Sequence, residues 1–309
     1  MEVHFDYSNY HVQKAIITTG VFDGVHRGHV ALFNRLNEVA KSMQGESVVV
    51  TFWPHPQLVL KQNSNTKLLN TLEEKLLLLE KSHIQHVVII PFTPEFSALS
   101  SEDFTSTILV DKLKVCYLIM GYNHHFGKDR QGNFEMMKKF ANRFQFQVEK
   151  LEAQIVENKN VSATLIRNTL LDGDVETAGK YLGYDYPMSG RVIEGDKLGR
   201  TIGYPTANLK IDHEFKLIPK PGVYAVEVEI SGSRFPGMLN MGYRPTIETH
   251  AQQLSIEVHV INFVENIYGK LITLHFKQKI RNEIKFNGLE ELKKQLDDDK
   301  SKVVKLLGA

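Results

Sequence analysis

The sequence of 309 residues contains a single cysteine and lacks any long apolar segment. A lone cysteine cannot form an internal disulfide, so Cys116, within an apolar run, is predicted to be a small buried side chain rather than a nucleophile. No apolar run approaches the ~20 residues of a membrane span. The N-terminal residues also lack the basic and apolar regions of a signal peptide. These absences predict a soluble cytoplasmic protein that does not bind membranes.

A strong charge of either sign is also missing. The chain has 37 basic and 36 acidic residues, for a formal net charge of +1 at pH 7. This balance gives no bulk attraction to nucleic acid or to a membrane surface, so neither is expected as a partner. A chain of this length can bury a sizeable core and is expected to form two domains. Its oligomeric state is left open.

Short apolar runs alternate with helical patterns through about residue 185. The predicted strands are 15–20, 47–53, 86–92, 115–120 and 145–151. The predicted helices are 28–43, 71–83, 100–113, 133–144 and 162–183. This alternation predicts a Rossmann-like α/β domain, in which helices cover both faces of a parallel sheet. Ligands of such sheets bind beyond the carboxyl ends of the strands.

The pattern changes near residues 184–187, where runs of period two replace the alternation. Such runs cover residues 223–230, 254–260 and 271–276, and turn residues separate them. They predict a small antiparallel β-barrel, followed by a closing helix near the end of the chain. We therefore expect one domain over residues 1–185 and a second over residues 186–309.

The most informative segment is residues 20–29, Gly-Val-Phe-Asp-Gly-Val-His-Arg-Gly-His. It stands between a predicted strand and a predicted helix, where glycines allow close approach of a ligand and the helix N-terminus favours an anion. His26 and His29 are three residues apart, so both rings can be directed at one phosphate. This pattern suggests stabilisation of charge on phosphorus without a covalent intermediate. Zinc binding would need a third ligand, and no suitable residue is nearby in sequence.

Two further loops follow predicted strands, at residues 51–56 and 121–127. Because parallel strands end at one edge of the sheet, all three loops are expected to lie together. Loop histidines of this kind are as often structural as catalytic, and the two loops contain His55, His124 and His125.

On these segments, together with residues 91–104, the first domain resembles nucleotidyltransferases with the His-x-Gly-His signature. The resemblance is closest to the FMN adenylyltransferase half of bacterial bifunctional FAD synthetases and spans about residues 13–185. It implies transfer of AMP from ATP to FMN, which yields FAD. It also implies roles for six residues: catalytic His26 and His29, nucleotide-binding Gly20, Phe22 and Gly28, and flavin-binding Asn123.

The second nucleotide motif of that superfamily, Ser-Ser-Thr-x-x-Arg, matches residues 162–167. Ala163 replaces the second serine, which removes one hydroxyl. The resemblance implies that Ser162, Thr164 and Arg167 bind the nucleotide, with Arg167 carrying charge to the triphosphate. The alternative is an ordinary helix cap, because serine and threonine favour that position.

The second domain resembles riboflavin kinase over about residues 186–307, and residues 203–208 match its Gly-x-Pro-Thr-Ala-Asn motif. Thr206 and Asn208 are two apart, so in an extended segment their side chains share a face. Both offer oxygen to a hard cation, and Mg²⁺ is therefore the expected metal. Gly203 belongs to a loop that is expected to fold over the phosphates of ATP.

Glu257 lies in the alternating run 254–260 and faces away from the apolar side chains. Spacing alone favours an exposed strand glutamate. The resemblance instead implies that Glu257 is the general base for the riboflavin 5′-hydroxyl. Arg281 begins a segment that matches the family's Arg-x-Glu-x-Lys-Phe pattern, which implies a flavin or phosphate clamp. The alternative for Arg281 is a surface arginine.

Together the two resemblances imply a bifunctional enzyme with ATP, riboflavin and FMN as substrates and Mg²⁺ as the metal. The barrel would convert riboflavin to FMN, and the α/β domain would convert FMN to FAD and pyrophosphate. Two alternatives stay open. Ala163 can mark a weakened adenylyl site that leaves mainly a kinase, or the chain can be a flavin-binding regulatory protein without catalysis.

Overall fold

The computed structural model describes residues 1–60, 66–122, 124–128, 131–152, 155–156, 158–195, 198–245 and 252–308. It divides into two compact units, Met1–Ala163 and Thr164–Ala309. The division falls before the predicted functional boundary, because helices α7 (Ala163–Asp172) and α8 (Val175–Leu182) belong almost entirely to the second unit.

The first unit contains a parallel sheet of six strands in the order β1-β4-β3-β2-β5-β6. This confirms the predicted sheet and its central strands, whereas the edge strand β1 was not predicted. Apolar runs on the central strands are buried on both faces, which is typical of parallel sheets. The strands are β1 (Glu2–His4), β2 (Ala15–Thr19), β3 (Glu46–Trp53), β4 (His86–Pro91), β5 (Val115–Met120) and β6 (Gln147–Lys150).

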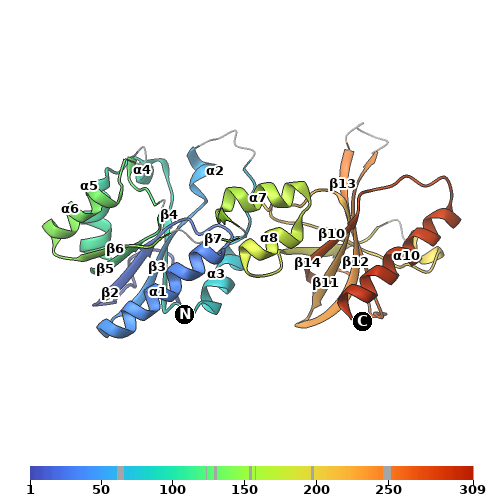
Figure 1. Ribbon diagram of the computed structural model, residues 1–309, viewed down its shortest axis with the longest axis horizontal. Coiled ribbons are helices and arrows are strands. Elements are labelled where there is room, and N and C mark those ends of the chain that lie inside the picture. Colours follow the sequence, from blue (N-terminus) through green and yellow to red (C-terminus); the bar gives the residue numbers. More distant parts are fainter. Residues whose placement is uncertain are drawn as a thin grey trace. The chain divides into compact units, whose positions relative to one another are not determined.

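Helices cover both faces of this sheet (Figure 1). On one face, α1 (Arg27–Met43) and α3 (Leu72–Lys81) bury an apolar stripe that includes Phe33 and Leu36. On the other face, the π-helix η1 (Phe104–Lys112) and α6 (Phe134–Phe144) pack against the strands. The shorter elements are α2 (Pro56–Leu60), α4 (Pro94–Ser97), α5 (Ser101–Asp103), β7 (Ile155–Val156) and β8 (Lys159–Asn160).

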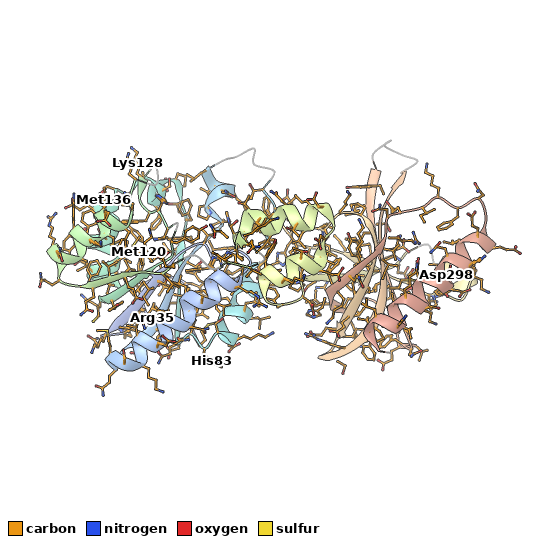
Figure 2. The ribbon with its side chains drawn as sticks, in the orientation of Figure 1. Arg35, His83, Met120, Lys128, Met136 and Asp298 are labelled. Carbon is orange, nitrogen blue, oxygen red and sulfur yellow. The ribbon has the colours of Figure 1, made fainter. Side chains whose placement is uncertain are left out.

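Polar contacts hold two of these helices in place. Thr71 and Glu74 form a capping box at the start of α3. Arg35 on α1, labelled in Figure 2, forms an ion pair with Glu149 on β6 at 2.9 Å. The hydroxyl of Tyr117 donates a hydrogen bond to the same carboxylate. These contacts hold α1, and with it the residues at its N-terminus, against the sheet.

The second unit is built around a closed antiparallel barrel in the order β10-β13-β12-β11-β14-β9, which confirms the predicted barrel. Strands β9, β10 and β12 were not among the predicted runs. The strands are β9 (Pro187–Ile193), β10 (Ala207–Lys210), β11 (Gly222–Ile230), β12 (Ser233–Pro245), β13 (Gln252–Val260) and β14 (Leu271–Arg281).

Helices α8 and α10 (Leu289–Leu307) pack on the barrel, and the short α9 (Leu198–Thr201) precedes β10. The long helix predicted over residues 162–183 is instead two helices, because Gly173 adopts a left-handed φ of +86° between them. On α8, Tyr181 and Leu182 are fully buried. The backbone N–H of Lys220 donates to the Leu170 carbonyl at 3.1 Å and ties α7 to the barrel.

Two expectations about the whole chain can be compared with the structure. Cys116 on β5 is half-buried, not fully buried as predicted, because it lies on the partly exposed first half of its strand. Within the described ranges, no helix has both the length and the apolar character that a membrane crossing requires.

Candidate active sites

Hydrogen bonds connect the three predicted loops at the carboxyl edge of the parallel sheet. The backbone N–H of Gly20 donates to the Val50 carbonyl at 3.0 Å. The Thr51 hydroxyl donates to the Val21 carbonyl at 3.2 Å. Thr19 Oγ1 and His124 Nε2 lie 3.0 Å apart. The 20–29 segment is therefore held by residues of β3, and Thr19, which directly precedes it, contacts the 121–127 loop, so the three loops lie together as the topology of a parallel sheet predicts.

Phe22 forms an aromatic support beneath the histidine pair. It is buried and adopts a left-handed φ of 50°, and its ring lies edge-on to His29 and to Phe33, with centroids 5.1 Å apart in each case. A Cβ at Gly20 would lie 2.8 Å from this ring, so only glycine permits the arrangement. Gly28 is the second residue of α1, and its Cα faces the His26 ring.

The two histidines of the motif stack on each other. Their ring centroids are 3.6 Å apart and their planes differ by 18°. His26 precedes the first residue of α1 and makes no side-chain cap, so both rings lie at the helix N-terminus. The Nδ1 atoms of both rings are buried and have no hydrogen-bond partner among the described residues. An anion at this position would meet polar groups that the protein itself leaves unsatisfied.

Burial controls the charge of this pair. It lowers the pKa of His26 from its ordinary value to about 4, although Asp23 raises it in part. Burial also lowers the pKa of His29 well below the ordinary value, and the charges of His26 and Lys75 lower it further. Both rings are therefore neutral at pH 7, and each offers one N–H donor rather than a positive charge.

Lys75 on α3 belongs to the same site and was not identified from the sequence. It is 2 % exposed, and its Nζ donates to the Val21 carbonyl at 2.8 Å. Burial lowers the pKa of Lys75 to about 8, against the opposing effect of Asp23. The Asp23 carboxylate accepts hydrogen bonds from the backbone N–H groups of Leu69 and Asn70. Its position in the sequence could have indicated its burial, because Lys75 lies four residues before the buried Leu79, on the apolar face of its helix.

The residues of the second nucleotide motif include Ala163, the last residue of the first unit along the chain. Ser162 is half-buried and directly precedes α7, which begins at Ala163. Thr164 is exposed and Arg167 is half-buried on α7. Their contact with a nucleotide stays a prediction. The predicted flavin contact Asn123 lies outside the described residues.

In the barrel, Glu257 on β13 is held by two hydroxyl groups. Thr206 Oγ1 donates to Glu257 Oε2 at 3.1 Å, and Ser255 Oγ donates to Glu257 Oε1 at 2.9 Å. Asn208 on β10 is the direct register partner of Glu257. The strands thus bring the predicted base and both predicted metal ligands together. Their donor set contains only oxygen ligands, which fits a hard divalent cation.

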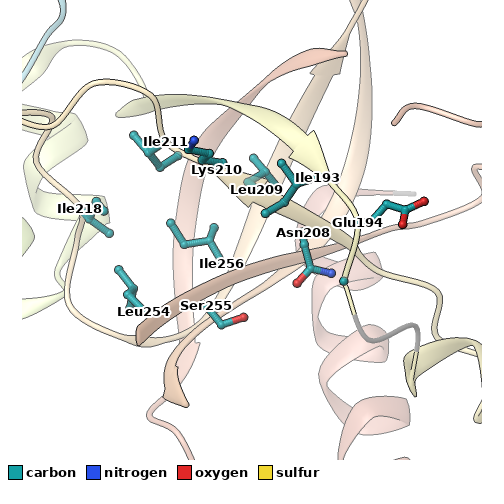
Figure 3. Close-up of a pocket in the computed structure, with 11 residues that line it drawn as sticks. Ile193, Glu194, Asn208, Leu209, Lys210, Ile211, Ile218, Leu254, Ser255 and Ile256 are labelled. Atoms are coloured by element: carbon teal, nitrogen blue, oxygen red, sulfur yellow. The ribbon is translucent and has the colours of Figure 1, made fainter. Parts of the chain in front are cut away.

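Two pockets of the barrel unit meet this cluster. The larger, of about 440 Å³, includes Asn208 and Ser255 in its lining, with apolar side chains of neighbouring strands (Figure 3). The smaller, of about 300 Å³, is lined by Thr206 and by Arg200, Phe263 and Tyr268. Each predicted metal ligand therefore faces a space large enough for part of a small-molecule substrate.

Gly203 and Arg281 complete the predicted set. Gly203 has a left-handed φ of +85°, in the turn that leads from α9 to Thr206. Arg281 on β14 is not a surface arginine, because its guanidinium donates to the fully buried carboxylate of Asp299 on α10 at 2.8 Å. This ion pair fastens the closing helix to the barrel. Its predicted role as a clamp stays a prediction.

Comparisons with known proteins separate the same two parts. Residues 8–165 match the family model described as FAD synthetase, and residues 182–307 match the one described as riboflavin kinase. The chain belongs to the bifunctional riboflavin kinase/FMN adenylyltransferase family. The member from Listeria monocytogenes is 38% identical over 92% of this chain and 90% of its own length. The member from Haemophilus influenzae is 39% identical over 93% and 92%.

A solved structure is similar over both parts of the chain. The crystal structure described as a macrolide-efflux protein from Streptococcus pneumoniae is 28% identical to this chain, with a TM-score of 0.88. The similarity covers 97% of both chains. The α/β domain followed by a β-barrel is therefore a shared architecture, and the two family models assign each part to one activity.

Proposed function

We propose that the chain makes both flavin cofactors, with one reaction in each part. The barrel phosphorylates riboflavin to FMN, and the parallel-sheet domain adenylylates FMN to FAD. The observation that carries this proposal is that each part of the chain matched by a family model contains its own cluster of side chains suited to the reaction of that family. These clusters are the stacked His26 and His29 in the first part and the Glu257 group in the second.

In the kinase reaction, we assign proton removal to Glu257. The carboxylate accepts the proton of the riboflavin 5′-hydroxyl as that oxygen attacks the γ-phosphorus of ATP, and ADP leaves. Hydrogen bonds from Thr206 and Ser255 hold one carboxylate oxygen each, which orients the base. Since the Thr206 hydroxyl donates its proton to Glu257, its lone pairs are free to face a cation. Thr206 and Asn208 would hold Mg²⁺, which supplies screening of phosphate charge.

In the adenylyl reaction, we assign His26 and His29 to the nucleotide phosphates. An oxygen of the FMN phosphate attacks the α-phosphorus of ATP and pyrophosphate leaves, so the protein needs no nucleophile of its own. Neutral imidazoles can donate hydrogen bonds to the charge that develops, which is electrostatic stabilisation by preorganised donors. The Lys75 bond to the Val21 carbonyl keeps the loop in place for this task.

Chromatography of flavin products tests the proposal and separates it from the alternatives. The full chain is incubated with riboflavin, ATP and Mg²⁺, and samples are taken over time. We expect FMN first and FAD later, and neither product when the divalent metal is chelated. FMN without FAD, also when FMN is supplied, would leave a kinase alone. The absence of both products would favour a non-catalytic flavin-binding protein.

A further inference from the structure

A second histidine cluster lies at the opposite edge of the parallel sheet. Glu2 and His4 are two apart on β1, so their side chains share a face. His86 is the first residue of β4 and the register partner of Glu2. It therefore marks the amino end of its strand, whereas residues 20–29, the proposed phosphate loop, lie beyond the carboxyl ends. The cluster is separate from the adenylyl site.

Three ligand atoms converge in this cluster. His4 Nε2 and His86 Nδ1 are 3.2 Å apart. Glu2 Oε2 lies 3.9 Å from His4 Nε2 and 3.6 Å from His86 Nδ1. In a tetrahedral zinc site, bonds of about 2.0–2.1 Å place neighbouring ligand atoms about 3.4 Å apart. The three observed distances bracket that value.

The surroundings of His86 fix which ring nitrogen faces the cluster. His86 Nε2 lies 2.9 Å from Glu46 Oε2, so this nitrogen carries the proton and donates it to the carboxylate. Nδ1 of the ring then faces the cluster. His4 Nε2 lies within hydrogen-bond distance of this nitrogen, and the Glu2 carboxylate lies beside both atoms. A cation among the three atoms would accept a lone pair from each of them.

The two histidines of the cluster are buried, whereas its carboxylate is open to solvent. The side chains of His4 and His86 are 8 % and 9 % exposed, and the Tyr10 ring packs edge-on to His4 with centroids 5.5 Å apart. The Tyr10 hydroxyl donates to the Leu113 carbonyl, which holds that ring in turn. Glu2 is 73 % exposed, so an ion can reach the rings and keep water as a further ligand.

We propose that Glu2, His4 and His86 form a binding site for a divalent transition-metal ion of the zinc class. Glu46 orients His86 from outside the ligand set, and a water completes the coordination. Two imidazoles and one carboxylate suit zinc better than Mg²⁺, which prefers oxygen ligands. The bound ion would join the edge strand β1 to β4 and so stabilise the folded sheet.

The test is calorimetric titration of the chelator-treated full chain with Zn²⁺ alone, repeated with Co²⁺ to record its visible absorption. We expect one ion per chain and the strong absorption of a four-coordinate Co²⁺ site. His86→Ala should lose at least 100-fold in affinity. Glu2→Gln, at an exposed position that cannot disturb folding, should lose about tenfold, and Glu46→Gln about 10–100-fold.

The matched control is His83→Asn, which removes an exposed imidazole three residues before His86 (Figure 2). Asparagine tolerates the left-handed φ of 57° at this position. This variant should bind Zn²⁺ as the original chain does. The proposal is overturned if Glu2→Gln retains the full affinity, if the Co²⁺ absorption persists in folded His86→Ala, or if the original chain binds no ion.

Discussion

The two proposed sites differ in how far their central side chains are exposed to water. In the parallel-sheet domain, burial keeps His26 and His29 neutral, so they donate hydrogen bonds without carrying charge. In the barrel, Glu257 is half-buried, and its two carboxylate oxygens accept hydrogen bonds from Thr206 and Ser255. The difference follows from the chemistry proposed for each. A group that must accept a proton stays solvated, whereas a group that only orients phosphate oxygens can be desolvated.

The sites also differ in what holds their residues in position. The barrel site depends on strand register, because Asn208 and Glu257 are direct neighbours on β10 and β13. The phosphate loop depends on contacts from separate elements, including Thr51 on β3 and Lys75 on α3. Neighbouring strands fix their side chains relative to each other through the sheet, whereas the loop is positioned by side-chain contacts from separate elements.

The largest effect is expected for the proposed base of the kinase. Glu257→Gln keeps the size and one acceptor oxygen but cannot take a proton at neutral pH. We expect kcat for FMN formation to fall about 10²–10⁴-fold, with riboflavin binding retained. FAD formation from added FMN, measured on the same preparation, should not change. A normal kinase kcat would remove Glu257 from the role of base.

The reverse separation is expected at the phosphate loop. His29→Ala should lower the rate of FAD formation from FMN about 10²–10³-fold, since one preorganised donor is lost. FMN formation from riboflavin should stay near that of the original chain. The two rates are measured separately, with circular dichroism to show that the variant is folded. Equal loss of both activities in a folded variant would contradict separate sites.

The observed units sharpen the predicted boundary of the kinase. A fragment of residues 164–309 retains α7 and α8, whereas a fragment of residues 186–309 lacks the buried Tyr181 and Leu182. We expect both to phosphorylate riboflavin when folded. The shorter should lose about 3–6 kcal/mol of unfolding free energy, because each of these two buried side chains contributes about 1.5–3 kcal/mol. Urea denaturation of the two fragments provides the measurement, and equal midpoints would show that α8 does not stabilise the barrel.

The buried histidine predicts how stability depends on pH. Because the pKa of His26 is near its ordinary value in the unfolded chain and about 4 in the folded one, the unfolded state binds more protons between pH 6.5 and 4. Stability should therefore fall as pH falls through this window. The His26→Gln variant lacks this contribution. The unfolding free energy of the original chain should drop by about 2 kcal/mol more than that of the variant between pH 7 and 4.5. Parallel curves would show that His26 titrates normally.

The smallest effect is expected at the position that departs from the nucleotidyltransferase motif. Ala163→Ser restores a hydroxyl on the first, half-buried residue of α7 without a change of fold. We expect the KM for ATP in FAD formation to decrease by no more than about threefold, the scale of one exposed hydrogen bond. The kinase KM serves as the internal reference. Abolished FAD formation would show that residues 162–167 are not at the nucleotide.

The sequence alone predicted the fold class and the central residues of each cluster, His26 with His29 and Thr206 with Asn208 and Glu257, but neither Lys75 nor Ser255. Alternating apolar runs specify a parallel sheet, and period-two runs specify a barrel, because side-chain periodicity is a local property. The spacing of His26 and His29 and the position of Thr206 relative to Asn208 were also local. The sequence did not predict the break at Gly173, since periodicity continued across it and only the packing of α7 and α8 required two directions.

Tertiary structure alone decided the electrostatic character of these residues. The neutrality of His26 and His29, the burial of Lys75 and the ion pair between Arg281 and Asp299 all depend on groups far away in sequence. The same holds for the contact between His4 and His86, which lie on the neighbouring strands β1 and β4. A pKa or an ion pair is set by the solvent and charges around a group, and those surroundings exist only once distant segments have packed.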